Sequence, residues 1–134
     1  MDNIQKNKLL FMAATSALFV GLGSFAPWVK VAFASANGLD GGGDGFLTLG
    51  ISVAALSSVY LYWAKSWRKT AILITLLGVC AAALGGYEMH HIRAALDSDP
   101  EYASMGTIGW GLWLVLISGI WLAIDGLLML KRNR

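Results

Sequence analysis

Four long apolar segments dominate the pattern of this sequence. They cover residues 9–29, 46–64, 70–87 and 108–130. Asp125 is the one residue in them that is Asp, Glu, Lys, Arg or His. A helix needs roughly 20 apolar residues to cross about 30 Å of hydrocarbon, so each segment is long enough to span a bilayer. We therefore predict an all-α membrane protein, a bundle of four transmembrane helices. A single domain covers residues 1–134, with spans at about 9–29, 46–64, 70–90 and 108–130.

The composition agrees with a chain embedded in lipid. Of the 134 residues, 57% are hydrophobic and 13% are charged, whereas soluble domains are about 45–50% apolar and about 25% charged. A soluble domain of this length could not bury so much apolar surface. These values exclude a disordered chain, a disulfide scaffold and a basic nucleic-acid-binding domain, and we expect no nucleic-acid partner.

The Lys and Arg residues predict the orientation of the spans. Eight of the ten lie in the N-terminal arm, in the connection between the second and third segments, and in the C-terminal tail. These are Lys6, Lys8, Lys65, Arg68, Lys69, Lys131, Arg132 and Arg134. The other two connections are mainly acidic. Because Lys and Arg concentrate in cytoplasmic loops, we expect a multi-pass protein of the plasma (inner) membrane with both termini in the cytoplasm.

The first segment has a second interpretation as a secretory signal peptide, since small residues at 34–36 resemble a cleavage site. Its apolar run, however, is longer than the roughly 7–15 residues of such a segment. Trp28 and Lys30 also interrupt the approach to that cleavage site. We therefore expect the first segment to remain as a membrane span.

The two outer connections differ in their local pattern. Residues 29–33 alternate loosely and are rich in β-branched residues, which allows a short strand in the first outer loop. The Gly-rich residues 37–45 that follow predict a flexible turn or linker. The second outer connection begins as an extension of the third helix to about Leu96, and the residues up to Pro100 then interrupt that helix.

Small residues recur at four-residue spacing in every span. The predicted helix-packing rows are Ala13, Ala17 and Gly21; Gly50, Ala54 and Ser58; Gly78, Ala82 and Gly86; and Gly111, Gly119 and Ala123. Residues four apart share one face of a helix, and small residues let two helices approach closely in lipid. The rows therefore predict a tightly packed bundle.

Three short motifs lie next to the ends of the predicted spans. Pro27-Trp28 follows the first span, Gly43-Asp44-Gly45 opens the second, and Gly109-Trp110-Gly111 opens the fourth. In this layout the chain resembles small four-span membrane proteins of actinobacteria and their phages. The functions of that group are mostly unassigned, so the resemblance implies a bacterial membrane protein and its topology, and no activity. The plan is also similar to that of claudin-type proteins, without their paired loop cysteines.

Asp125 is a candidate functional residue, because a charge inside a span is costly and usually functional. It lies six residues before Lys131, about 9 Å along a helix, and can reach the inner interface. We favour a structural pairing with a lysine there. The lysines in question are Lys6, Lys8, Lys65 and Lys69. The alternative is a proton or cation path, or a contact with a basic residue of a partner.

Metal and catalytic signals fall short of a site. Glu88 and His91 share a helix face, and Asp40 or Asp44 from the other outer loop can join them. Two ligands at helical spacing are fewer than the three or four that zinc requires, so we expect no metal and no cofactor. His90 and His91 are the only histidines, and Cys80 lies inside the third span. No catalytic set can be assembled, and we expect no enzyme.

These observations favour a non-enzymatic accessory or scaffold subunit. It would act through helix–helix and outer-loop contacts in the bilayer, with a membrane-protein partner or as a homo-oligomer. One alternative is an oligomeric channel or small transporter, which needs a polar lining that the spans supply only thinly. A further alternative, drawn from the phage side of the resemblance, is an exclusion or immunity factor.

Overall fold

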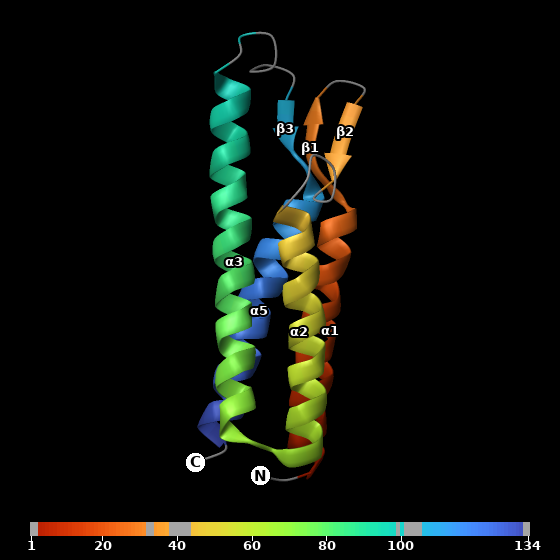
Figure 1. Cartoon of the computed structure of the whole chain (residues 1–134), viewed down its shortest axis with the longest axis vertical. Coiled ribbons are helices and arrows are strands. Elements are labelled where there is room, and N and C mark those ends of the chain that lie inside the picture. Colours follow the sequence, from red (N-terminus) through yellow and green to blue (C-terminus); the bar gives the residue numbers. More distant parts are fainter. Residues whose placement is uncertain (1–2, 32–33, 38–43, 99, 101–105, 133–134) are drawn as a thin grey trace.

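The computed structural model describes residues 3–31, 34–37, 44–98, 100 and 106–132. Within these residues four helices run alongside one another (Figure 1). They are α1 (Asn3–Phe25), α2 (Asp44–Lys65), α3 (Arg68–Asp97) and α5 (Trp110–Arg132). Each is long and apolar enough to cross a membrane by length and composition. The prediction of four apolar helices in an all-α arrangement is confirmed at that level.

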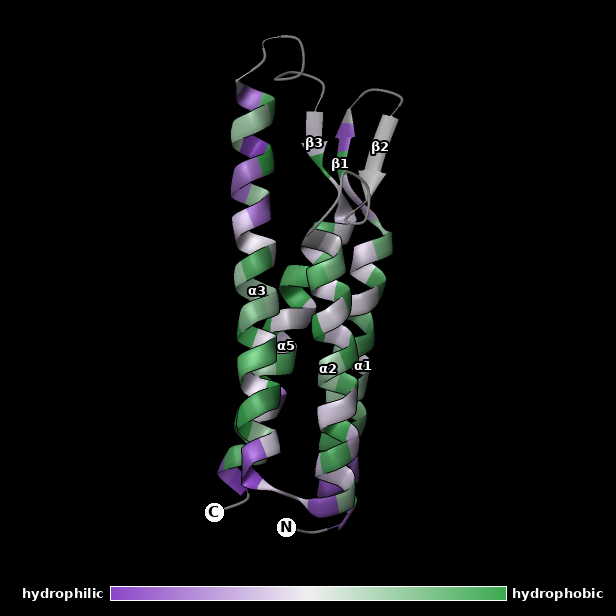
Figure 2. Ribbon diagram, viewed as in Figure 1, coloured by the Kyte–Doolittle hydropathy of each residue, from purple (hydrophilic) through white to green (hydrophobic). Residues whose placement is uncertain are grey.

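The two ends of the molecule differ in content. The chain termini and the α2–α3 connection lie at one end, here called the terminal end, and three short strands lie at the other, the sheet end (Figure 1). Hydrophilic residues gather at the terminal end and in the last turns of α3, with apolar residues between (Figure 2). At the terminal end the Lys6 ammonium donates to the carbonyl oxygen of Trp63 at 3.2 Å and also to the hydroxyl of Ser66. The start of α1 is thereby tied to the α2–α3 connection.

A small antiparallel sheet closes the sheet end. Its central strand β1 (Pro27–Val31) pairs with β2 (Ala34–Asn37) on one side and with β3 (Gly106–Ile108) on the other. The strand expected over 29–33 is therefore present, two residues earlier. The backbone N–H of Gly109 donates to the carbonyl oxygen of Trp28 at 2.7 Å and extends the pairing toward α5. The sheet joins two connections that are far apart in sequence.

The sheet also corrects two of the predicted span limits. The first helix ends at Phe25 rather than at 29, because a proline disfavours the helical conformation of the residue before it and lacks an N–H for the ladder. The fourth helix begins at Trp110 rather than at 108, because Ile108 belongs to β3. The third helix continues to Asp97 as expected. Of the Gly-rich linker, residues 38–43 lie outside the described part.

The closest helix contact joins α3 and α5. A Cβ added at Gly78 would collide with the backbone of Ala123, and a Cβ added at Gly119 would collide with the backbone of Ala82. A Cβ at Gly126 would meet Thr75 in the same way. Backbones in contact gain dispersion energy along their whole length, which is the main attraction available between helices in lipid. The α3–α5 interface is therefore the packing centre of the bundle.

Some residues of the predicted packing rows are buried between helices, and others are not. Buried positions are Ala13, Ala17, Gly21, Ser58, Gly78, Gly111 and Gly119, and half-buried positions are Ala82, Gly86 and Ala123. Gly50 and Ala54 are exposed. No atom lies within 4 Å of the place that a Cβ would take at Gly50 or at Gly86. These two glycines do not pack against another helix of the chain.

The exposure of Gly50 and Ala54 follows from the way α2 is rotated about its axis. This helix turns the face of Ser52, Ala55 and Tyr62 toward the bundle, and Gly50 lies on a different side of the same helix. Small residues do recur at four-residue spacing in α2. The spacing alone, however, does not determine which face of the helix packs against its neighbours. Conversely, Gly23 and Gly126 make close contacts although they stand outside the predicted rows.

Candidate functional site

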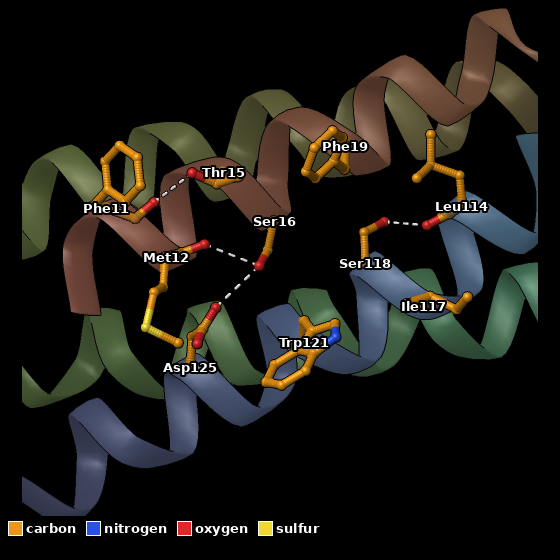
Figure 3. A pocket seen from close by; sticks show the side chains of 10 residues that line it. All are labelled: Phe11, Met12, Thr15, Ser16, Phe19, Leu114, Ile117, Ser118, Trp121 and Asp125. Atoms are coloured by element: carbon orange, nitrogen blue, oxygen red, sulfur yellow. Dashed lines mark hydrogen bonds between the residues drawn. The ribbon is translucent and has the colours of Figure 1, made fainter. Parts of the chain in front are cut away.

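A groove runs between α1 and α5 on the outside of the bundle (Figure 3). Its cavity volume is about 460 Å³. The α1 side is lined by Phe11, Met12, Thr15, Ser16 and Phe19, and the α5 side by Leu114, Ile117, Ser118, Trp121 and Asp125. Both sets follow the spacing of one helix face, so the groove is formed by two facing stripes. We call it the α1–α5 groove.

The rims and the floor of the groove differ in chemistry. Phe11, Phe19, Ile117 and Trp121 are exposed and form apolar rims. The floor holds the buried side chains of Ser16, Ser118 and Asp125. Because the rims point away from the bundle, an occupant would enter from the surroundings of the helices rather than from the interior of the chain.

Asp125 is the least satisfied polar residue of the groove. Its side chain is 0% exposed, and its Oδ2 accepts a hydrogen bond from the Ser16 hydroxyl at 3.1 Å. The same hydroxyl lies 2.9 Å from the carbonyl oxygen of Met12, and it has one proton to share between the two acceptors. Asp125 Oδ1 has no hydrogen-bond partner among the described residues. Since buried polar groups are normally hydrogen-bonded, this oxygen lacks a donor, which the described residues do not supply.

The expected pairing of Asp125 with a lysine is not present. Within the described residues, the one ion pair is between Arg93 and Asp97. Lys6, which was expected within reach, bonds to the α2–α3 connection instead. Ser16, opposite Asp125, is ten residues from Lys6, about 15 Å along α1. None of the four lysines forms an ion pair with Asp125 among the described residues.

The hydroxyl groups of the groove offer no free donor. Thr15 donates to the carbonyl oxygen of Phe11 at 2.8 Å, and Ser118 donates to the carbonyl oxygen of Leu114. Both protons are used within the helix that carries them, as Figure 3 shows. The hydroxyl oxygens keep lone pairs, and Asp125 has one buried carboxyl oxygen without a donor among the described residues. The floor of the α1–α5 groove therefore offers acceptor oxygens, and the indole N–H of Trp121 on the rim is a donor.

The second group of candidate residues lies on the last turns of α3. Glu88 is buried, whereas His90 and His91 are exposed. The His91 ring stacks on Tyr87, with ring centroids 6.0 Å apart. Of the proposed companions, Asp40 lies outside the described residues and Asp44 is the first residue of α2. The described ranges contain no group of three or more His, Cys, Asp or Glu residues that could hold a metal.

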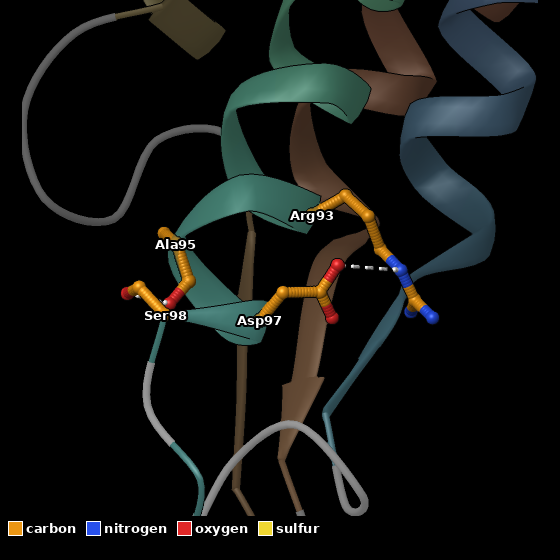
Figure 4. A network of polar contacts seen from close by, with 4 residues as sticks. All are labelled: Arg93, Ala95, Asp97 and Ser98. Carbon is orange, nitrogen blue, oxygen red and sulfur yellow. Dashed lines mark hydrogen bonds and ion pairs between the residues drawn. The ribbon is translucent and has the colours of Figure 1, made fainter.

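Local contacts stabilise the end of α3. Arg93 and Asp97 form an exposed ion pair at 3.7 Å, one helical turn apart (Figure 4). The Ser98 hydroxyl donates to the carbonyl oxygen of Ala95 at 2.8 Å. An exposed pair at this spacing contributes about 0.3–0.5 kcal/mol. These residues stabilise the end of α3, and their side chains do not point toward a common ligand position.

Comparison of the chain with protein-family models, with characterised proteins and with solved structures finds no match. The resemblance to small membrane proteins of actinobacteria and their phages therefore stays a prediction. No residue role is transferred from a relative, and the α1–α5 groove supplies the basis for a function.

Proposed function

We propose that the chain is a non-enzymatic, multi-pass membrane protein that serves as an accessory or scaffold subunit. Its recognition surface is the α1–α5 groove. The observation that carries the proposal is the buried carboxyl group of Asp125, whose Oδ1 lacks a hydrogen-bond partner in the described chain. A buried polar atom without a hydrogen-bond partner costs about 1–3 kcal/mol. A partner that supplies the missing donor would remove that cost.

The alternative of a channel or transporter has less support. The largest fully buried side chains of the bundle include Tyr62, Ile74, Leu122 and Met129, and they fill its interior. The hydroxyls of Ser24 and Thr48 bond to one another. A conduction path needs repeated polar positions along its length, and the described part of a single chain offers no such row. The lateral groove fits a contact role better.

The proposed orientation has both termini in the cytoplasm of a bacterial cell. It is supported by the eight basic residues of the termini and the α2–α3 connection. In a chain with Cys80→Ala, a cysteine introduced at Ser98 should react with a membrane-impermeant maleimide added to intact cells. A cysteine introduced at Asn3 should react only after the cells are opened. Both positions are exposed, so labelling of Asn3 from outside would reverse the orientation.

The contact role can be tested by photo-crosslinking in native membranes. A photoreactive amino acid at Ile117, on the groove rim, should give an adduct of discrete mass. The matched control is Leu76, which is similarly exposed but lies on α3. The adduct at Ile117 should fall in an Asp125→Asn chain and should be absent at Leu76. Equal patterns at both positions, or no protein adduct at Ile117, would remove the groove as a recognition surface.

A further inference from the structure

The shape of the α1–α5 groove matches a helix lying parallel to its walls. The α1 stripe runs from Phe11 to Phe19 and the α5 stripe from Leu114 to Asp125. These stripes are about 12 Å and 16 Å long at 1.5 Å per residue, which is two to three helical turns. Rows of side chains with a furrow between them are the surface into which the ridge of another helix packs. The form therefore favours a helix over a compact small molecule.

The chemistry of the floor selects a hydrogen-bond donor with positive charge. Thr15 and Ser118 have used their protons on their own helices. Asp125 Oδ1 has no partner in the described chain. An ammonium group carries three donors and no acceptor, and a guanidinium carries five. Either group complements the acceptor oxygens of the floor.

The rims of the groove suit the side chain that bears such a charge. Phe11, Phe19 and Trp121 stand at its edges. Long basic side chains cover apolar surface with their methylene groups, and their charged ends are attracted to aromatic faces. A lysine or arginine that reaches Asp125 would therefore find apolar contacts along its stem.

A second copy of this chain does not meet the requirement. The four apolar segments 9–29, 46–64, 70–87 and 108–130 contain no Lys, Arg or His. A second groove would bring another carboxyl group to the first, and two ionised carboxyl groups at close range repel each other. The cation has to come from a different polypeptide.

We infer that the α1–α5 groove receives a transmembrane helix of another protein, and that one lysine or arginine of that helix pairs with Asp125. This inference rests on the proposed accessory role and adds the chemistry of the partner. The basic residue lies at the depth of Asp125, six residues from Lys131 and so about 9 Å inside the terminal end.

The inference can be tested with a synthetic helix in lipid vesicles. Purified full-length chain is reconstituted with a Leu/Ala peptide of roughly 20 residues that carries Trp anchors and one Lys at the depth of Asp125. The control peptide has Leu in place of that Lys. Association is measured by energy transfer between labels on the chain and on the peptide. We expect the Lys peptide to associate at least about tenfold more tightly, as a charge-assisted hydrogen bond allows.

Two variants of the chain sharpen the measurement. Asp125→Leu should remove the preference for the Lys peptide. Asp125→Lys should reverse it, so that a peptide with Asp at the same depth is preferred. Because the comparison of the Lys and Leu peptides changes only the peptide, it does not depend on the folding of any variant.

The outcomes separate this inference from the proposed function. Equal association of the two peptides would overturn the basic partner, and the accessory role would still stand if Ile117 gives its discrete adduct. An adduct of twice the chain mass would make the groove a contact between copies, which also overturns the inference. Binding of tetraphenylphosphonium that depends on Asp125, without any gain for the Lys peptide, would assign the groove to small organic cations instead. Loss of both the adduct and the peptide preference would end both proposals.

Discussion

Two faces of α5 make an instructive contrast. Toward α3 the helix presents Gly119 and Gly126, and the two backbones touch. Toward α1 it presents Asp125, Trp121 and Ile117, which line a groove of about 460 Å³. Asp125 and Gly126 are neighbours in sequence, yet they serve different surfaces. One face of α5 packs against α3, and the other lines the α1–α5 groove.

The difference follows from side-chain size. Between helices in lipid there is no hydrophobic force, so close approach needs small residues. α1 and α5 do meet closely near the sheet end, where Gly23 lies against Val115 and Gly111 lies against Ala26. Further along, large side chains line both helices, and the α1–α5 groove opens. Tight packing and an available surface thus occur along the same pair of helices.

The largest expected effect comes from breaking the tight face. Gly78→Ala places a methyl group into the backbone of Ala123 and should lower the free energy of unfolding by about 1–3 kcal/mol. Gly86→Ala, on the same helix, meets no atom within 4 Å and should be neutral or stabilising by up to about 1 kcal/mol. Denaturant titration in detergent micelles, followed by circular dichroism, measures both. Equal effects would mean that α3 and α5 do not touch at Gly78.

The second expected effect tests the floor of the groove. Ser16→Ala removes the only hydrogen bond to Asp125 within the described residues, so stability should fall by about 1–3 kcal/mol. Adding Asp125→Leu to that variant should restore most of the loss, because the unpaired carboxyl group is gone. The double variant is compared with both single variants by the same titration. A double variant less stable than Ser16→Ala alone would show that Asp125 is part of the folding core.

A third effect concerns the end at which α1 and α5 are close. The Trp28 indole donates to the carbonyl oxygen of Gly23 at 2.8 Å and packs with Leu112 and Val115. Trp28→Phe keeps a ring and removes the donor, which should cost about 1 kcal/mol. Unfolding monitored by circular dichroism gives the value. A loss no greater than that of Trp110→Phe, an exposed control, would mean that the indole bond contributes nothing.

The smallest expected effect lies on the groove rim. Ile117 is half exposed, at 50%, so Ile117→Ala should change stability by less than about 0.5 kcal/mol. The same variant should weaken association of the Lys peptide, because a rim contact is removed. Calorimetric or denaturant unfolding and vesicle binding are measured side by side. A large loss of stability with unchanged binding would invert the contrast between the two faces of α5.

The comparison of sequence and structure follows the same division. Hydropathy located four helices, because a membrane-length apolar run is a local property of the chain. The β-branched residues near β1 were enough to predict a strand there. By contrast, β3 (Gly106–Ile108) has only three residues and forms by pairing with β1. Small-residue rows indicated close packing, but Gly50 and Gly126 show that the rows could not tell which glycines take part.

The sequence by itself determined that Asp125 stands alone among the charges of the spans, since that depends only on residue type and position. It also determined the division of basic and acidic residues between the two ends. Only the tertiary structure decided that Asp125 meets Ser16 rather than a lysine, that its second oxygen has no partner among the described residues, and that the residue lines a groove. Those facts depend on the rotation of each helix and on which helix is its neighbour. Both arise from contacts between residues distant in the chain, which a local pattern does not contain.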